Sequence, residues 1–266
     1  MNSPRHQIGH GITVASIAGN YIDKVSYFGY ANGTSRRRAR ARIAVYKVDW
    51  EEGCNELDFL SGIENAIADG VDVIINISLG MEESTMLTNV ILMGTFAAME
   101  KGKLKQPSAT QAEIRQIERV RLRVPAVERV YPKFLFTANL IKAQLVNPAE
   151  STVKPDVMAP GSQILGARVP NKPAGYVQWL EFPSLASPHV TGLAALLKSA
   201  HPKWSPPAIR STILTANPFD NRQTPIQDAG NNFPFASPLA MGSGMILART
   251  FGAYQIQHVE SRSKKN

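Results

Sequence analysis

The sequence predicts an α/β fold in which helices cover a parallel sheet. Two observations carry this prediction. Residues 42–101 alternate between β-branched runs, typical of strands, and stretches with apolar residues at helical spacing. The apolar run Val71–Leu79 is typical of a central parallel strand that is buried on both faces. Strands and helices that alternate along the chain favour parallel pairing through helical crossovers.

The elements follow from their local patterns. Glu56–Asp69 carries apolar residues every three to four positions and is followed by Gly70, a typical helix terminator. Arg42–Val48 is β-branched and alternating, which indicates a strand. By the same criteria we expect a second strand over Val71–Leu79 and further helices over His10–Gly19, Met86–Lys101, Ala112–Arg123, Thr191–Ala200 and Pro206–Thr215.

Composition and length exclude several classes of protein. The chain has 266 residues, 44% of them hydrophobic, which is enough for one large domain or two small ones. Its longest apolar runs are too short to span a bilayer, and no apolar signal-peptide core follows Met1. The single cysteine, Cys54, rules out an internal disulfide and a multi-cysteine metal site, and it is expected to be a small structural residue. We expect no cofactor and no membrane partner.

Part of the net charge of +8 lies in two basic runs. One is Arg36–Arg42, and the other lies in the tail at Arg262, Lys264 and Lys265. Such runs can bind nucleic acid. No interleaved aromatic residues or nucleic-acid motif accompany them, so solvated basic segments are favoured and no nucleic-acid partner is expected. The sequence gives no indication of the oligomeric state.

Three segments are candidates for chemistry. His10 lies between two glycines at the start of an apolar helix, where an imidazole could act as a general base or simply cap the helix. Ser184 precedes a buried helix, where backbone N–H groups favour negative charge, although a serine there is also a common N-cap. Ser78-Leu79-Gly80 ends the apolar strand and could pair with an extended peptide, or be an ordinary strand exit.

The chain resembles the plant subtilases, the cucumisin-like branch of the subtilisin family. Blocks in family order carry the resemblance over about Asn2–Gly102 and Lys154–Gly244. They are Gly9-His10-Gly11 with Ala15-Ser16 (family G-H-G-T-H-x-A-S), Ala41–Val48 with Trp50 (A-R-I-A-V-Y-K-V-x-W), Ala68–Ile74 with Ser78-Leu79-Gly80 (A-D-G-V-D-V-I-x-x-S-L-G), Lys154–Gly161 (K-P-D-V-x-A-P-G), Ser184–Val190 (G-T-S-M-A-S-P-H-V, entered at its serine), His201–Ser211 and Phe235–Gly242.

The resemblance implies a subtilisin-like three-layer fold with a parallel central sheet, incomplete at the N-terminus and in the middle. It implies that His10 is the general base, Ser184 the nucleophile, and Ser78-Leu79-Gly80 the strand that holds the substrate. Protein or peptide substrates and an extracellular location follow from the same resemblance. The implied organisation is a first part of the catalytic domain at 1–102, a divergent segment at 103–153, a second part at 154–247 and a basic tail at 248–266.

The chain also departs from the family pattern. No acidic residue precedes His10, so the aspartate of the family's D-T/S-G segment is not found, and no A-G-N segment supplies the oxyanion asparagine. The protease-associated insert is missing. Phe182-Pro183 replaces Gly-Thr before the serine, and Thr13 replaces the family's second histidine. We therefore expect a serine endopeptidase with weak or no activity, or alternatively a catalytically dead relative that binds extended peptides.

Overall fold

A computed structural model describes the parts of the chain that build the predicted sheet and its helices. These are residues 9–19, 42–50, 53–71, 74–77, 90–101, 104–107, 156–159, 161, 164–167, 169, 177–180, 183–219, 224–227 and 234–246. The helices are α1 (His10–Gly19), α2 (Glu56–Ala68), α3 (Val90–Glu100), α4 (Ala186–Ala200), α5 (Pro206–Ile213) and α6 (Pro238–Met241), with a 3₁₀ turn, η2, at Pro183–Leu185. The strands are β1 (Asp49–Trp50), β2 (Gly53–Cys54), β3 (Ile74–Ile77), β4 (Leu104–Pro107), β5 (Ile164–Ala167) and β6 (Val177–Leu180).

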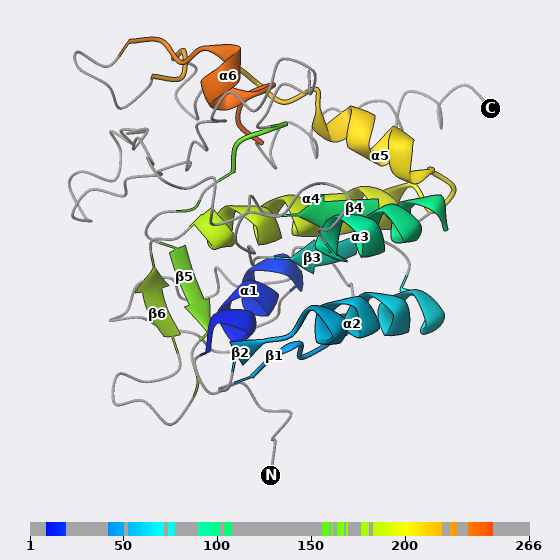
Figure 1. The fold of residues 1–266 in the computed structure, drawn as a ribbon. Helices are drawn as coiled ribbons and strands as arrows, with labels where there is room; N and C mark the ends of the chain where they lie inside the picture. The colour runs from blue at the N-terminus through cyan, green and yellow to red at the C-terminus, as the bar shows by residue number, and fades with distance from the viewer. Residues whose placement is uncertain are drawn as a thin grey trace.

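Strand β3 lies between two layers of helices. Successive side chains of a strand point to opposite faces of the sheet. Asn76 accepts hydrogen bonds from α4, whereas its neighbour Ile77 is buried in a cluster with Phe59 and Ile63 of α2 and Ala98 of α3. Figure 1 accordingly shows α2 on one side of β3 and α4 on the other. The result is a helix–sheet–helix sandwich, as the sequence predicted.

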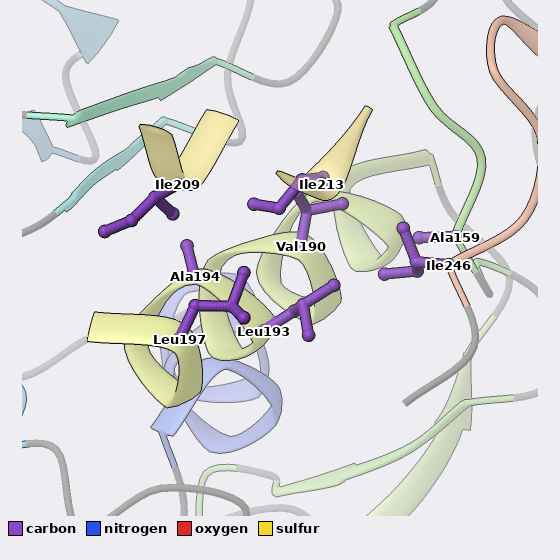
Figure 2. Close-up of a cluster of buried hydrophobic side chains, with 8 residues drawn as sticks. All are labelled: Ala159, Val190, Leu193, Ala194, Leu197, Ile209, Ile213 and Ile246. Atoms are coloured by element: carbon purple, nitrogen blue, oxygen red, sulfur yellow. The ribbon is translucent and has the colours of Figure 1, made fainter. Parts of the chain in front are cut away.

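Helix α4 is the centre of the largest described core cluster. Its residues Val190, Leu193, Ala194 and Leu197 are buried, and they recur at the three- and four-residue spacing of one helix face. They pack against Ile209 and Ile213 of α5 and against Ala159 and Ile246 from two segments without helix or strand (Figure 2). This packing fixes α4 on the side of the sheet opposite to α2 and α3.

Local signals explain where two of the helices begin. Asn55 is the N-cap of α2, where its side chain accepts the Leu57 N–H at 3.0 Å, and Glu56 and Asp58 place negative charge at the positive end of the helix. Ser205 is the N-cap of α5, and Pro206 follows at the first position, where its missing N–H has no cost.

Most predicted helices are present, with different ends. Helix α1 has the predicted bounds, while α2 and α5 end one and two residues earlier than predicted. Helix α4 begins at Ala186 and not at Thr191. Pro188 is compatible with this earlier start because it lies in the first helical turn, where backbone N–H groups have no intrahelical partner. Of the predicted helix at Met86–Lys101, Val90–Glu100 is helical and residues 86–89 lie outside the described part.

The predicted strand over Arg42–Val48 is wrong. This stretch carries no helix or strand in the structure. The strand β1 begins directly after it, at Asp49, and pairs with β2 in a short antiparallel arrangement. Two β-branched residues of Arg42–Val48 are exposed, Ile43 by 44% and Val45 by 73%. A strand exists only where a neighbouring strand pairs with it, and within the described part of the chain this stretch pairs with none.

The βα alternation continues beyond Gly102, into the range 103–153 that the resemblance identifies as divergent. Leu104–Pro107 forms β4, which pairs in parallel with β3 in the register Ile74 to Leu104 and Ile77 to Pro107. Strand β3, helix α3 and strand β4 therefore make one crossover unit of the kind that parallel pairing requires. Of the predicted Val71–Leu79 strand, residues 74–77 are in β3 and 78–80 lie outside the described part. The expected Ala112–Arg123 helix, the basic tail and Arg36–Ala41 also lie outside it.

Candidate active site

His10 is the first residue of α1, and Gly9 sets the direction from which the chain enters the helix. Gly9 has a φ of 95°, a conformation that residues with a β-carbon rarely adopt. Its carbonyl accepts the Thr13 N–H at 3.1 Å, the first bond of the helical ladder. A β-carbon at position 9 would lie 3.4 Å from a methyl group of Val169. The glycine before the histidine therefore serves the backbone turn that presents the imidazole.

Ser184 lies in the 3₁₀ turn η2, immediately before α4. The next residue, Leu185, is fully buried in a cluster with Val14 of α1 and Ile164 of β5. Leu185 is also the N-cap residue of α4, and no side chain caps this helix. Ser184 is thus not an N-cap, which was the alternative interpretation of its position. The burial of its neighbour fixes the backbone that carries the hydroxyl.

The structure brings His10 and Ser184 together although 174 residues separate them. Nε2 of the imidazole lies 2.7 Å from Oγ of the serine, a hydrogen-bond distance. The two helices run in the same direction, because their starts meet here and Ala18, near the end of α1, lies against Gly192 in the middle of α4. A β-carbon at position 192 would approach the Ala18 carbonyl oxygen to 2.6 Å. Glycine allows this close approach.

The shared direction of α1 and α4 matters for charge. Each helix carries partial positive charge at its N-terminus, where the first backbone N–H groups have no intrahelical partner. Both N-termini face the pair formed by His10 and Ser184. An alkoxide or oxyanion that develops at this point is stabilised by such groups. The arrangement therefore combines an imidazole, a hydroxyl group and two helix N-termini at one place.

A polar link that the sequence reasoning missed ties α4 to the sheet. The side-chain amide oxygen Oδ1 of Asn76 in β3 accepts hydrogen bonds from the hydroxyls of Ser187 at 2.7 Å and Thr191 at 3.0 Å. Ser187 is 6% exposed, so the amide replaces solvent as its partner. The available signal was an asparagine inside the otherwise apolar run Val71–Leu79, since a polar side chain in a buried strand needs a partner.

The remaining candidate residues fall outside what the structure describes. Ser78, Leu79 and Gly80 are in this group, and they directly follow Ile77, the last residue of β3. Within the described ranges, no three His, Cys, Asp or Glu side chains are grouped closely enough to hold a metal ion. A search of the same ranges finds no helix with the length and apolarity needed to cross a membrane.

Solved structures share the arrangement of these elements. A likeness to sphericase covers 86% of this chain and 77% of that one, with a TM-score of 0.52 and 20% identity. A likeness to the prenylagaramide maturation protease PagA covers 93% and 82%, with a TM-score of 0.53 and 21% identity. At such identities these likenesses show the fold alone. They confirm the predicted α/β fold with the three-layer arrangement of subtilisins.

Sequence comparison finds plant relatives. The chain is 29% identical over 397 aligned positions to the subtilisin-like protease SBT3 of Solanum lycopersicum, which covers 92% of this chain and 52% of that protein. It is 46% identical over 112 residues, 41% of this chain, to the subtilisin-like protease SBT1.7 of Arabidopsis thaliana. In the first alignment the chain spans about half the length of its relative, and the aligned stretch is longer than the chain because the relative has residues that this chain lacks.

A model of the subtilase family matches the two regions that supply the paired side chains, residues 2–124 with His10 and residues 141–244 with Ser184. These regions make up most of the chain, and they contain the motif blocks on which the resemblance was first noted. The match agrees with the fold and with the plant relatives, and it establishes that this chain belongs to the subtilase family.

Proposed function

We propose that the chain acts as a serine endopeptidase, with Ser184 as the nucleophile and His10 as the general base. The observation that carries this proposal is the 2.7 Å separation of His10 Nε2 and Ser184 Oγ at the N-terminal ends of α1 and α4. A nucleophile and base within hydrogen-bond reach are the signature of acyl-transfer chemistry. Family membership supports the same reaction class.

The proposed reaction follows from this geometry. An imidazole with unprotonated Nε2 accepts the Ser184 hydroxyl proton while Oγ attacks the carbonyl carbon of a peptide bond. The imidazolium then gives this proton to the leaving amine as the C–N bond breaks, which leaves an acyl-serine. Water hydrolyses the acyl-serine with His10 again acting as base, and this step restores the free hydroxyl.

Ser78-Leu79-Gly80 is proposed to hold the backbone of the substrate. Two features support this role. The segment continues the chain from β3, and the Asn76 side chain of β3 is hydrogen-bonded to Ser187, three residues after the proposed nucleophile. A peptide that pairs with this segment as an added strand would pass close to Ser184. Substrates are then proteins or peptides, and by similarity to plant subtilases we propose an extracellular site of action.

The same contacts support one catalytic body built from residues 1–102 and 154–247. The bond between His10 and Ser184 and the bond between Asn76 and Ser187 each join these two ranges. Neither range holds the proposed pair on its own. We therefore propose that both are needed for any reactivity of Ser184.

A covalent probe tests the proposal better than turnover does. In subtilisin, loss of the triad aspartate lowers kcat by about 3 × 10⁴, and the aspartate of the family motif was not found in this sequence. A fluorophosphonate probe reports the reactivity of the serine itself, since it is attacked by an activated hydroxyl. We expect labelling of the wild-type chain, loss of labelling in Ser184→Ala and strongly slowed labelling in His10→Ala.

The matched control is Ser199→Ala, which removes an exposed hydroxyl from the last turn of α4, the helix that Ser184 precedes. Its labelling should equal that of the wild type. Circular dichroism establishes that every variant is folded before it is compared. A folded wild type that takes up no probe, or a Ser184→Ala variant that is labelled as fast as the wild type, contradicts the proposal. The first result would favour a chain that binds peptides without cleaving them.

A further inference from the structure

Helix α1 is attached to the edge of strand β5 by two hydroxyl groups. Thr13 Oγ1 donates a hydrogen bond to the Ala167 carbonyl oxygen at 2.8 Å, and the Ala167 N–H donates to Ser16 Oγ at 2.9 Å. The Ser16 hydroxyl in turn donates to the Thr13 carbonyl oxygen at 2.7 Å. The Thr13 hydroxyl also lies 3.2 Å from the Gly9 carbonyl oxygen within its own helix, so its proton is shared between two carbonyls with the shorter contact to Ala167. The backbone polar groups of a single strand residue are thus both satisfied by one face of the helix.

This contact takes the place of a strand partner. Strand β6 pairs with β5 in antiparallel register, Ala167 opposite Val177. In such a ladder, alternate residues direct their N–H and C=O groups away from the partner strand. Ala167 directs both groups to α1, where the hydroxyls of Thr13 and Ser16 meet them. A helix that packs through apolar side chains alone can slide or rotate slightly, whereas two directional bonds to one peptide unit fix both its axial position and its rotation.

The surrounding packing leaves α1 little alternative. Thr13 is completely buried, and a β-carbon added at Gly166 would overlap its methyl group. On the opposite side, α1 lies against α4 at Gly192, and Val14 packs with Leu185. Helix α1 is therefore held between β5 and α4, and its distance from each is set by a glycine.

The geometry points to Thr13 and Ser16 as positioning residues for His10, an inference that rests on the proposed function of the pair. His10 lies one helical turn before Thr13, so any movement of α1 along or around its axis carries the imidazole with it. Ser184 lies in the turn η2, directly before α4, and would not follow. The bonds to Ala167 thus hold Nε2 at the 2.7 Å distance from Oγ that proton transfer requires.

The decisive variant is Thr13→Val, which keeps the branched shape and removes the hydroxyl. The Ala167 carbonyl then loses its partner and α1 loses one of its two directional bonds. A displacement of about 1 Å between reacting groups can cost about a hundredfold in rate. We expect Thr13→Val to slow fluorophosphonate labelling by about tenfold to a hundredfold. Thr13→Ser keeps the hydroxyl and should retain most of the wild-type rate.

A control variant and a second readout separate positioning from a general loss of a hydroxyl. Thr212→Val removes the hydroxyl of a half-buried threonine in α5, whose bond stays within its own helix at the Ala208 carbonyl. This variant should label at the wild-type rate. Nitrogen-15 NMR of chain labelled at its five histidines gives a second readout, with the His10 signal identified as the one lost in His10→Asn. Thr13→Val should move that signal, and Thr212→Val should not.

Every outcome bears on the inference. A Thr13→Val variant with the wild-type labelling rate and an unmoved His10 signal would overturn it, as would a Thr212→Val variant that is slowed equally. If Thr13→Val does not fold, Ser16→Ala removes the other bond and is judged by the same measurements. If the wild-type chain takes up no probe while the His10 signal still moves in Thr13→Val alone, the positioning role holds and the proposed function fails.

Discussion

Leu185 offers a test of how the Ser184 hydroxyl is held. It is fully buried between α1 and β5, and it directly follows Ser184. Leu185→Ala removes apolar atoms from this cluster and leaves a cavity beneath the turn that carries the hydroxyl. Substitutions of this kind cost about 2–5 kcal/mol of unfolding free energy. Because domains are stable by only about 5–15 kcal/mol, the variant should remain folded with a clearly lower urea midpoint.

The matched substitution is Leu193→Ala, two turns later in the same helix. Leu193 is 6% exposed and packs in the cluster shared with α5, which contains no residue of α1. We expect a similar loss of stability but unchanged labelling by a fluorophosphonate probe. Leu185→Ala should in addition slow labelling by about tenfold or more, because without the leucine side chain Ser184 Oγ is held less firmly relative to the His10 imidazole. This reasoning would be refuted if Leu185→Ala lowered the free energy of unfolding by less than about 1 kcal/mol, or if both variants affected labelling equally.

Three further predictions concern the rest of the described structure. Gly9→Ala forces a β-carbon into a positive φ and should lower stability by about 1–2 kcal/mol, read from a shift in the melting temperature. On α2, Ile63→Ala removes a buried side chain and should lower the free energy of unfolding by about 2–5 kcal/mol. Leu57→Ala changes an exposed position and should lower it by less than about 0.5 kcal/mol. Equal urea midpoints of the two variants would show that α2 packs by another face. A hydrogen bond to Asp69 raises the pKa of Tyr46 above 10.0. The stabilisation of the folded state by this bond is therefore complete below pH 10.0 and is lost as the phenol ionises at higher pH. The stability difference between wild type and Tyr46→Phe should therefore shrink as pH rises above 10.0, and a difference that grows would contradict the assignment.

What the sequence predicted well was local. The bounds of α1 follow from a short apolar stretch that ends in glycine, and α2 follows from helical spacing between Asn55 and Gly70. The proximity of His10 and Ser184 was not derivable from spacing, because 174 residues separate them. It followed from the family resemblance, which supplies the long-range arrangement that a periodic pattern lacks.

The failures of prediction concern strands. Arg42–Val48 has the alternation of a strand but is not one, whereas Leu104–Pro107, with a lysine, a glutamine and a proline, is paired along its length with β3. Strand formation depends on whether an edge is available from elsewhere in the chain, and composition alone does not reveal this. Asn76 was overlooked for a related reason, because its partners on α4 are more than a hundred residues away.

Thr13 shows how a departure from the family pattern can be compatible with the fold. At this buried position the Thr13 hydroxyl donates a hydrogen bond to the Ala167 carbonyl oxygen. The Thr13 methyl group lies against Gly166. A threonine hydroxyl donates one proton, as does one nitrogen of a neutral imidazole, so replacement of the family's second histidine keeps a donor at this position. The identity of the residue changes while the chemistry that the position requires is retained. A sequence comparison that scores identity alone counts Thr13 as a loss, whereas the hydrogen bond to Ala167 shows that α1 is still anchored there.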